Sequence, residues 1–472
     1  MRAILAKGHG AGDGVGEPDR RLINYYAEVN EGDPARPVKL VTTPGTVDRD
    51  SGNVVQGNIR GFGQSDAFAS GAILVLDGTT LRTYDPSTGT WGALTGSVSG
   101  SDFADFAFTQ TELAVLSGGQ IYTSSNGTSI ALASDADFPA SITSIDGIGQ
   151  RIVMTASDGR WYYTDVLDAD SISALNFYTA EASPDRAIAA RVLGETLFIF
   201  GRKTIEPWFL SGVDQNDPFS RQSYVIPVGV ISRDAIAIVD DALFWVSEDR
   251  AVRLGDGPRP TVISPPWLVR ALQAETASNI RLFGYEAEGH AFLIVNGLTI
   301  CAAFDLTTQE WHIRRTNGSN SWDWAQIISD GGNQYVAKRT GSAFMQLTRN
   351  AATDEQPDDS TLGTDIERFG TAHLPHAEGR SPLGPIIAEL SHGVGLANGD
   401  GSDPVIGLRL SRDNGQTWTN RRDRDLGVQG AYEQRSKWVR NGRGRRPQTI
   451  AELRVVEPVQ HSITGLTFGS PS

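Results

Sequence analysis

The chain has 472 residues, of which 39% are hydrophobic and 21% charged, a composition typical of a globular protein with more than one domain. Its formal net charge of −15 argues against a general affinity for nucleic acid, which needs a basic surface. The single cysteine, Cys301, excludes an intrachain disulfide and a CxxC zinc site, and no 18-residue apolar run predicts a membrane span. The N-terminus lacks the apolar region of a signal peptide, so we expect folding in a cytoplasm.

Residues 1–45 are predicted to form an N-terminal arm. The glycine-rich run Gly8–Gly16 contains GxGxxG-like spacings, but no apolar strand of useful length precedes it and no helical pattern follows. A terminal loop, flexible or ordered by a partner, is therefore favoured over a phosphate cradle.

A strand–turn–strand pattern recurs seven times after the arm. The first strands begin near residues 72, 113, 152, 197, 243, 292 and 335, at steps of 41, 39, 45, 46, 49 and 43 residues. A repeat of roughly 40–50 residues built from hairpins is typical of propeller blades, and one hairpin cannot bury its apolar face alone. The sequence thus predicts an all-β protein with a β-propeller of six or seven blades over residues 46–350. A pair of β-sandwiches with ordinary meanders is the alternative fold.

Helical patterns are scarce. The best candidate is Trp267–Ala277, which follows Pro265-Pro266 and places Leu268, Val269 and Leu272 on one helical face.

Beyond the propeller, residues 351–360 are predicted to be a linker, because Asn350–Asp359 has no apolar residue larger than alanine. Residues 361–472 are predicted to form a C-terminal β-sandwich-like domain. Its expected strands are Ile386–Leu390, Val405–Leu410, Lys437–Val439, Ile450–Val456 and Ile463–Phe468.

One turn in this domain matches the Asp-box pattern S-x-D-x-G-x-T-W. Its defining residues are Ser411, Asp413, Gly415 and Trp418. Asp413 is suited to accept backbone N–H groups, Gly415 to supply a positive φ, and Trp418 to pack under the hairpin. Sialidases carry several such boxes as structural turns, whereas this chain has one full copy outside the expected propeller, so we predict a structural role.

The largest charge asymmetry lies at residues 409–446, with 11 basic and 4 acidic residues, a net +7 that leaves −22 for the remainder. A basic segment within it is predicted to contact another subunit or a partner; it consists of Arg421, Arg422, Arg424, Arg435, Lys437, Arg440, Arg443, Arg445 and Arg446. A solvated face and a contact with DNA phosphates are the alternatives.

Several stretches resemble the packaged-DNA stabilisation protein family of short-tailed phages. The resemblance rests on Leu197–Gly212 (LFIFGRKTIEPWFLSG), Asn24-Tyr25-Tyr26 with Thr43-Pro44-Gly45, Tyr162–Asp165, Leu410–Gly415 and Trp438–Arg446. Their order along the chain matches from end to end.

This resemblance implies a structural virion protein, not an enzyme, assembled in the host cytoplasm and located in the tail. Members form the tail hub or nozzle: a ring, expected to be a homohexamer, below the portal and an adaptor (head-to-tail connector) ring. The ring closes the DNA exit channel, stabilises the packaged genome, supports tail fibres or spikes and a needle or plug, and touches double-stranded DNA during ejection. The resemblance implies no catalytic residues, and we expect no cofactor or metal.

Two other functions fit a propeller. A sialidase-like glycosidase predicts carboxylates and arginines that converge in a pocket at the propeller's central opening. A kelch-like or carbohydrate-binding propeller predicts a monomer with exposed aromatic residues, for which Trp322 and Trp324 are the candidates.

Overall fold

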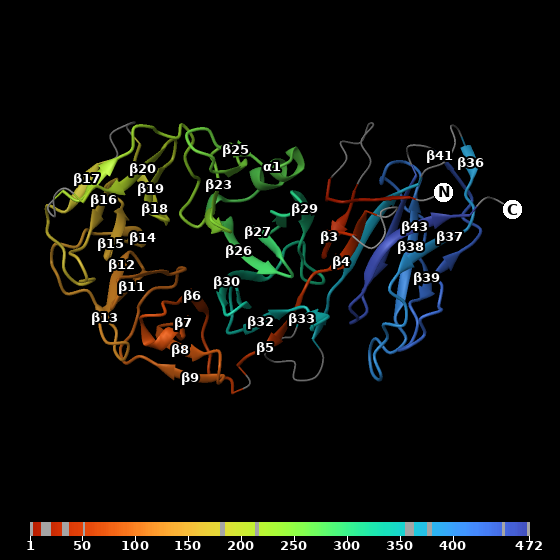
Figure 1. The fold of residues 1–472 in the computed structure, drawn as a ribbon, viewed down its shortest axis with the longest axis horizontal. Helices are drawn as coiled ribbons and strands as arrows, with labels where there is room; N and C mark the ends of the chain where they lie inside the picture. The colour runs from red at the N-terminus through yellow and green to blue at the C-terminus, as the bar shows by residue number, and fades with distance from the viewer. Residues whose placement is uncertain are drawn as a thin grey trace.

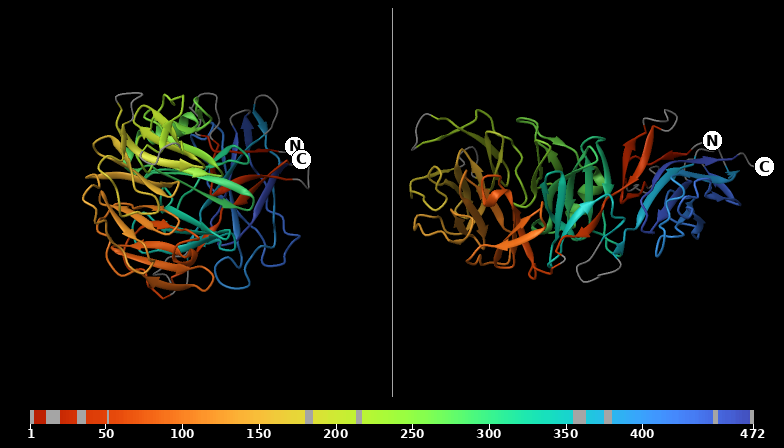
Figure 2. Two further views of the ribbon diagram at one scale, coloured as in Figure 1. Left: turned by 60° about the vertical axis from the view of Figure 1, so that its left-hand side comes forward. Right: turned by 60° about the horizontal axis from the view of Figure 1, so that its bottom comes forward.

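The computed structural model describes residues 3–10, 20–30, 37–50, 52–179, 185–212, 217–354, 363–374, 380–445 and 449–469. The molecule is elongated, with a ring of small sheets at one end and a two-sheet unit at the other (Figures 1 and 2).

The ring consists of seven blades, each built from four antiparallel strands. The first four blades are β6–β9 (Ile59–Gly63, Ile73–Asp77, Thr80–Asp85, Thr90–Ala93), β10–β13 (Asp105–Phe108, Leu113–Ser117, Gln120–Ser124, Ala131–Leu132), β14–β17 (Ile142–Ile148, Arg151–Ala156, Arg160–Tyr163, Phe177–Thr179) and β18–β21 (Ala187–Leu193, Thr196–Gly201, Ile205–Leu210, Phe219–Arg221). Blade 5 is β22–β25 (Ile236–Val239, Ala242–Val246, Val252–Leu254, Thr261–Val262), and blade 6 is β26–β29 (Arg281–Ala287, His290–Asn296, Cys301–Asp305, Glu310–Ile313). Blade 7 contains β30–β32 (Trp324–Asp330, Asn333–Lys338, Phe344–Thr348) and β5 (Gly45–Asp48).

The predicted propeller is confirmed, and it has seven blades in the described chain. Every expected hairpin forms the second and third strands of a blade, where the apolar runs are buried on both faces. First strands of successive blades contact one another in most pairs, and β30 contacts β6 where the ring closes. Buried clusters fill the spaces between neighbouring blades, so each sheet is stabilised by packing on the next.

Blade 7 joins the two ends of the ring. Its outermost strand, β5, comes from the N-terminal side and pairs antiparallel with β32, with Gly45 opposite Thr348 and Asp48 opposite Met345. A strand contributed from the other end of the propeller sequence thereby covers the edge of the last blade.

Helix is confined to one short α-helix and two 3-10 turns in the described residues. The helix α1 (Pro266–Gln273) starts at the second proline of the expected pair and buries Trp267, Leu268 and Leu272. It ends four residues before the predicted Ala277, because a separate 3-10 turn, Ala277–Asn279, follows it. The other 3-10 turn is Ala69–Gly71.

The two-sheet unit at the other end is the sandwich that the sequence predicts. One sheet has the order β3-β4-β43-β37-β40, and the other continues β2-β35-β42-β38-β39. These strands are β2 (Leu22–Ile23), β3 (Tyr25–Val29), β4 (Val38–Thr42), β35 (Arg368–His373), β37 (Ile386–Leu390), β38 (Val405–Ser411), β39 (Arg422–Asp425), β40 (Lys437–Trp438), β42 (Ile450–Val455) and β43 (Ser462–Phe468). One buried cluster, which includes Tyr25, Leu408, Trp438 and Leu453, lies between the sheets.

The segment predicted as an N-terminal arm supplies strands to these sheets. β1 (Ile4–Leu5) pairs with β35, and β3 and β4 extend the sheet of β43. β2 lies between β35 and β29, so blade 6 and one sandwich sheet form a continuous ten-stranded sheet. Most of the Gly8–Gly16 run, from residue 11, lies outside the described residues.

The segment predicted as a linker is described only to Asp354. Its described part contains a short strand, β33 (Thr353–Asp354), which pairs with β5 and with β34 (Thr364–Asp365). Near this segment, side chains tie the propeller to the sandwich. The Asn24 amide donates to the carbonyls of Arg315 (2.9 Å) and Glu367 (2.8 Å), and buried Arg314 donates to the Pro44 carbonyl (3.2 Å).

Candidate functional site

The basic segment lies on adjacent edge strands of the two sandwich sheets. β39 ends one sheet and β40 ends the other, and the Trp438 indole donates to the Arg422 carbonyl (2.7 Å) to hold them together. A third short strand, β41 (Arg443–Arg445), pairs with β36 (Arg380–Pro382). The exposed members of the segment are Arg421, Arg424, Arg435, Lys437, Arg440 and Arg443, while Arg422 is half-buried. The side chain of Arg445 and the whole of Arg446 lie outside the described residues.

The anchored arginines of this face bind mainly to uncharged groups. Arg424 Nε donates to the Lys437 carbonyl (2.9 Å), and Arg422 Nη1 to the Val439 carbonyl (2.8 Å). Arg412 likewise donates to the carbonyls of two residues near β41. An exposed ion pair, Arg421–Asp423 (3.3 Å), is the exception. Backbone carbonyls orient a guanidinium without neutralising it, so the surface keeps its positive charge.

The crowding of cations has an electrostatic consequence. Burial, with the neighbouring charges of Arg424 and Arg412, lowers the pKa of Arg422. Repulsion of this kind is relieved by an external anion, so the face is suited to bind an acidic partner.

The Asp-box turn is built by local hydrogen bonds. The Ser411 hydroxyl donates to Asp413 (2.7 Å) and accepts the Gly415 N–H (2.8 Å), while Asp413 accepts the N–H of Thr417 (2.8 Å). The φ of Gly415 is 97°, in the region that favours glycine. Hydrogen bonds from the side chain and N–H of Thr417 lower the pKa of Asp413. The carboxylate therefore serves as an acceptor within the hairpin.

Trp418 of this box is half-buried between two arginines. The guanidinium carbons of Arg409 and Arg21 lie 4.6 Å and 5.4 Å from its ring centroid, and both arginines pair with the buried carboxylate of Glu452. The turn thus packs against the outer face of the sheet formed by β38 and β42, as a structural element.

Charged side chains also converge where the propeller blades meet, at the place expected for a glycosidase site. Arg233, from the start of blade 5, reaches Asp102 (3.3 Å) and the Thr143 carbonyl (3.1 Å) on blades 2 and 3. Arg281 of blade 6 lies over the Phe103 ring at 3.4 Å and pairs with Asp234 (3.7 Å). Contacts between blades so far apart in the ring require these side chains to cross its centre.

Further pairs complete this axial network. Arg60 pairs with Asp102 (3.5 Å) and Arg191 with Asp105 (3.5 Å). Burial lowers the pKa of Arg281 to about 10, whereas burial is outweighed at Arg233 by Asp105, Asp234 and Asp102, which raise its pKa. Because these carboxylates are engaged with arginines, the network serves to join the blades and does not present a free acid and base.

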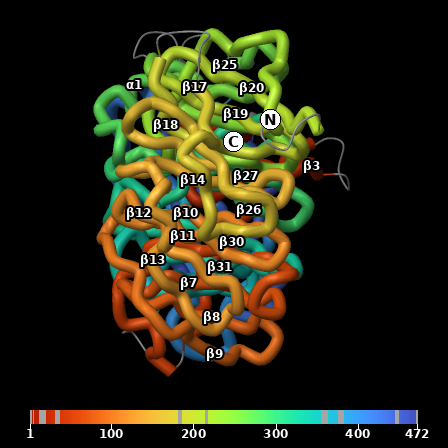
Figure 3. The backbone as a smooth tube through the Cα atoms, turned by 90° about the vertical axis from the view of Figure 1, so that its left-hand side faces the viewer, coloured from red at the N-terminus to blue at the C-terminus, as the bar shows by residue number. Residues whose placement is uncertain are grey.

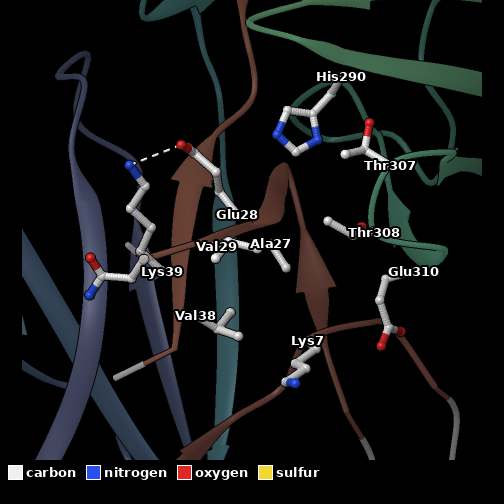
Figure 4. A pocket seen from close by; sticks show the side chains of 11 residues that line it. Lys7, Ala27, Glu28, Val29, Val38, Lys39, His290, Thr307, Thr308 and Glu310 are labelled. Carbon is white, nitrogen blue, oxygen red and sulfur yellow. Dashed lines mark ion pairs between the residues drawn. The ribbon is translucent and has the colours of Figure 1, made fainter. Parts of the chain in front are cut away.

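A cleft of about 700 Å³ lies between β3 and β4 of the sandwich and the β28–β29 turn of blade 6 (Figure 4). Glu28 and Lys39 form an ion pair across one wall (3.0 Å). On the other wall His290 Nδ1 lies 2.8 Å from Asp305, and this hydrogen bond raises the pKa of the histidine. Acidic and basic groups alternate around the cleft, so its charge does not select one class of ligand.

Other expectations are settled by burial. Trp322 and Trp324 are 2% and 1% exposed, so the prediction that they present aromatic surface to a ligand is wrong; they pack in the core between blades 6 and 7. No metal-binding group of histidine, cysteine or acidic residues occurs within the described ranges. No helix among the residues described is long and apolar enough to span a membrane.

The axial network escaped the sequence analysis, although a signal was present. Arg60, Asp105, Asp146, Arg191 and Arg281 each occupy the first strand of a blade. Charged residues recurring at the innermost strands of a propeller have to meet near its axis, so their repeat position could have identified the network.

Comparison with protein families agrees with the blade architecture. The family model described as "Bacteriophage P22 Gp10, beta-propeller" matches residues 18–351, more than half of the chain. No curated protein sequence matches this chain.

Solved structures with some likeness include BamB from Moraxella catarrhalis, with 12% identity over 66% of this chain and 98% of the other, and a TM-score of 0.41. The WD40 β-propeller domain of Doa1 has 13% identity over 65% of this chain and 95% of the other, and a TM-score of 0.39. The designed protein Ika8 gives 10% identity, 62% and 97% coverage, and a TM-score of 0.40. These scores are too low to support any statement about function. The family match, together with the seven blades, shows that the chain belongs to the phage stabilisation family of P22 Gp10 and is a phage structural protein.

Proposed function

We propose that this protein is the tail hub or nozzle subunit of a short-tailed phage. Copies of the chain form a ring, a homohexamer, on the adaptor ring below the portal. This ring closes the DNA exit channel, holds the packaged genome, and supports tail fibres or spikes and a needle or plug protein. The family match to a phage stabilisation propeller is the observation that carries the proposal.

The packing of the propeller supports a load-bearing role. Each blade shares buried clusters with its neighbours, and the axial arginines link blades that are not neighbours, as Arg233 does between blades 5 and 2. A fold cross-linked in this way resists deformation by internal pressure better than a string of independent sheets.

The filled axis also limits where DNA can pass. Arg233 and Arg281 cross the centre of the propeller, so a duplex cannot run through one subunit. In a hub, the channel therefore lies between subunits, around the symmetry axis of the ring. The net charge of −15 favours a lumen that repels phosphates and lets DNA slide during ejection.

Phage particles assembled without this protein test the proposal. We expect heads that fill with DNA but lose it, measured as nuclease-sensitive genome, and retention restored by wild-type protein supplied in trans. Labelled protein is expected at the tail vertex of complemented particles. Particles that keep their genome and a complete tail without the protein would contradict the role.

A further inference from the structure

We propose that opposite ends of the molecule bind each other in neighbouring copies. An acidic face on blades 2 and 3 of one subunit receives the basic face of the next, which is the surface of the sandwich around β39, β40 and β41 that carries the exposed cations of the basic segment. This inference rests on the proposed ring and names the surfaces that build it. Figure 1 places β13 and β17 at one end of the long axis and β39 at the other, and Figure 3 looks onto the end with β13 and β17.

The acidic face consists of residues 131–138 and 164–176, two loops at the outer edge of blades 2 and 3. They contain five aspartates, Asp135, Asp137, Asp165, Asp168 and Asp170, and no arginine, lysine or histidine. Carboxylates join the loops: Asp135 accepts the Ile172 N–H (3.1 Å), Asp137 the Ala174 N–H (3.1 Å) and Asp170 the Ser134 N–H (2.8 Å).

These carboxylates keep their negative charge available. Hydrogen bonds from the N–H groups of Asp137 and Ile172 lower the pKa of Asp135, which is therefore ionised at neutral pH. Over the ranges that the structure describes, none of the five forms an ion pair with an arginine or lysine. The face is thus the electrostatic counterpart of the sandwich edge, where cations are oriented by backbone carbonyls.

Both faces also expose large apolar side chains. Of the fourteen such side chains in the described residues, four lie in the two loops of the acidic face and three within residues 409–446, the range of the basic segment. They are Leu132, Val166, Leu167 and Leu175 in the first, and Val428, Tyr432 and Val439 in the second. The most exposed are Leu175 at 82% and Tyr432 at 77%.

This combination favours a protein partner over DNA. A segment that exposes an aromatic residue, aliphatic side chains and arginines is typical of protein interfaces, whereas exposed apolar side chains contribute nothing to phosphate binding. The remainder of the chain carries −22, which repels a polyanion but attracts the basic face of a second copy. Because the two faces differ and lie at opposite ends, the contact is head-to-tail, the class that generates a ring when the rotation between neighbours closes.

Charge reversal on each face tests the contact. Full-length D137K/D165K and R435E/K437E change exposed residues, and E195K/E248K, on exposed turns of blades 4 and 5, is a control with the same change in charge as D137K/D165K. The mass of each protein is measured alone and on the adaptor ring, with circular dichroism to confirm folding. We expect either variant alone to need a concentration at least about tenfold higher than wild type to assemble, and the control to assemble normally. An equimolar mixture of the two variants is expected to form complexes containing both chains, because each supplies the face that the other lacks.

Any other assembly result from folded variants contradicts the proposed contact. If either variant assembles like wild type, or if the mixture stays monomeric, the proposed contact is wrong. Normal assembly of R435E/K437E with lost binding to a short DNA duplex would assign the basic face to DNA instead. Should a reversal unfold the chain, the neutral variants D137N/D165N and R435Q/K437Q replace it. If wild-type protein stays monomeric on the adaptor, the proposed ring itself is wrong. This outcome is distinguishable from the loss of this contact alone, in which only the variants fail to assemble.

Discussion

Arginine serves two different purposes in the propeller and in the sandwich. At the propeller axis, Arg60, Arg191, Arg233 and Arg281 lie close to aspartates of other blades or of their own. On the sandwich edge, Arg412, Arg422 and Arg424 donate to backbone carbonyls, which leaves their charge facing outward. The partner of an arginine, more than its presence, therefore separates a residue that joins blades from one that attracts another molecule.

Among single substitutions, the largest expected effect is the loss of an axial arginine. Replacing Arg233 with alanine leaves the carboxylates of Asp102 and Asp234 without one of their cations near the centre of the ring. We expect a loss of about 2–3 kcal/mol in the free energy of unfolding, measured by denaturant titration. The matched variant is Arg435→Ala on the sandwich, which is exposed and should change stability by less than about 0.5 kcal/mol. Equal effects of the two substitutions would show that the axial pairs have no special role.

Acid should weaken the protein next, through histidines near the junction of the two regions. Burial lowers the pKa of His9, His312 and His461 to about 3. Since an unfolded histidine titrates near 6.5, the stability that these groups contribute is complete above that pH and is lost as the pH falls from about 6.5 towards 3. At pH 5 the loss is about 2 kcal/mol for each histidine.

Two groups change the stability in the opposite direction as the pH falls, against the three histidines. Burial raises the pKa of Asp354 to about 6, and the hydrogen bond with Asp305 raises that of His290, so both favour folding as the pH falls. The net expectation is a lower melting temperature at pH 5 than at pH 7.5. His312→Leu removes one proton acceptor whose Nε2 has no hydrogen-bond partner among the described residues, and should reduce the acid loss. The hypothesis fails if His312→Leu and wild type lose equal stability.

A smaller effect is expected at the Asp-box turn beside the basic face. Asp413→Ala removes the acceptor for the N–H and hydroxyl of Thr417 and should cost about 1 kcal/mol, because the turn is local. Asp413→Asn keeps one carbonyl oxygen and should cost less. Thermal melts of the two variants measure this difference, and the reverse order would argue against the hydrogen-bonded turn.

The smallest change in stability is expected on the basic face itself. Arg424→Gln removes an exposed guanidinium whose partners are two backbone carbonyls, so unfolding should shift by no more than about 0.5 kcal/mol. Its effect should appear instead as weaker assembly at low salt, where unscreened charge matters most. A large loss of stability without any change in assembly would place Arg424 with the axial arginines.

The sequence predicted the hairpins well because each is local. Strands such as β7 and β8 pair across a tight turn of a few residues, so their apolar runs and the turn between them can be recognised from neighbouring residues alone. By contrast, β2 pairs with β35 and β29, hundreds of residues away, and nothing in the two residues Leu22–Ile23 indicates these partners. The predicted N-terminal arm could not reveal that it supplies strands to the sandwich.

The candidate faces were predicted only in part. The basic segment is visible as a run of arginines, but the use of backbone carbonyls as their acceptors depends on how β39 and β40 meet. The acidic face is harder to recognise, because its five aspartates come from two loops that are separated by three strands and are brought together by hydrogen bonds.

The most direct test of the hub is the mass of the purified full-length chain, alone and after mixing with the adaptor ring, followed by particle imaging. We predict a closed ring with six times the mass of one chain, formed either in solution or on the adaptor, with the basic face of each copy against blades 2 and 3 of the next. A chain that stays monomeric at every concentration and does not bind the adaptor would contradict the proposed function.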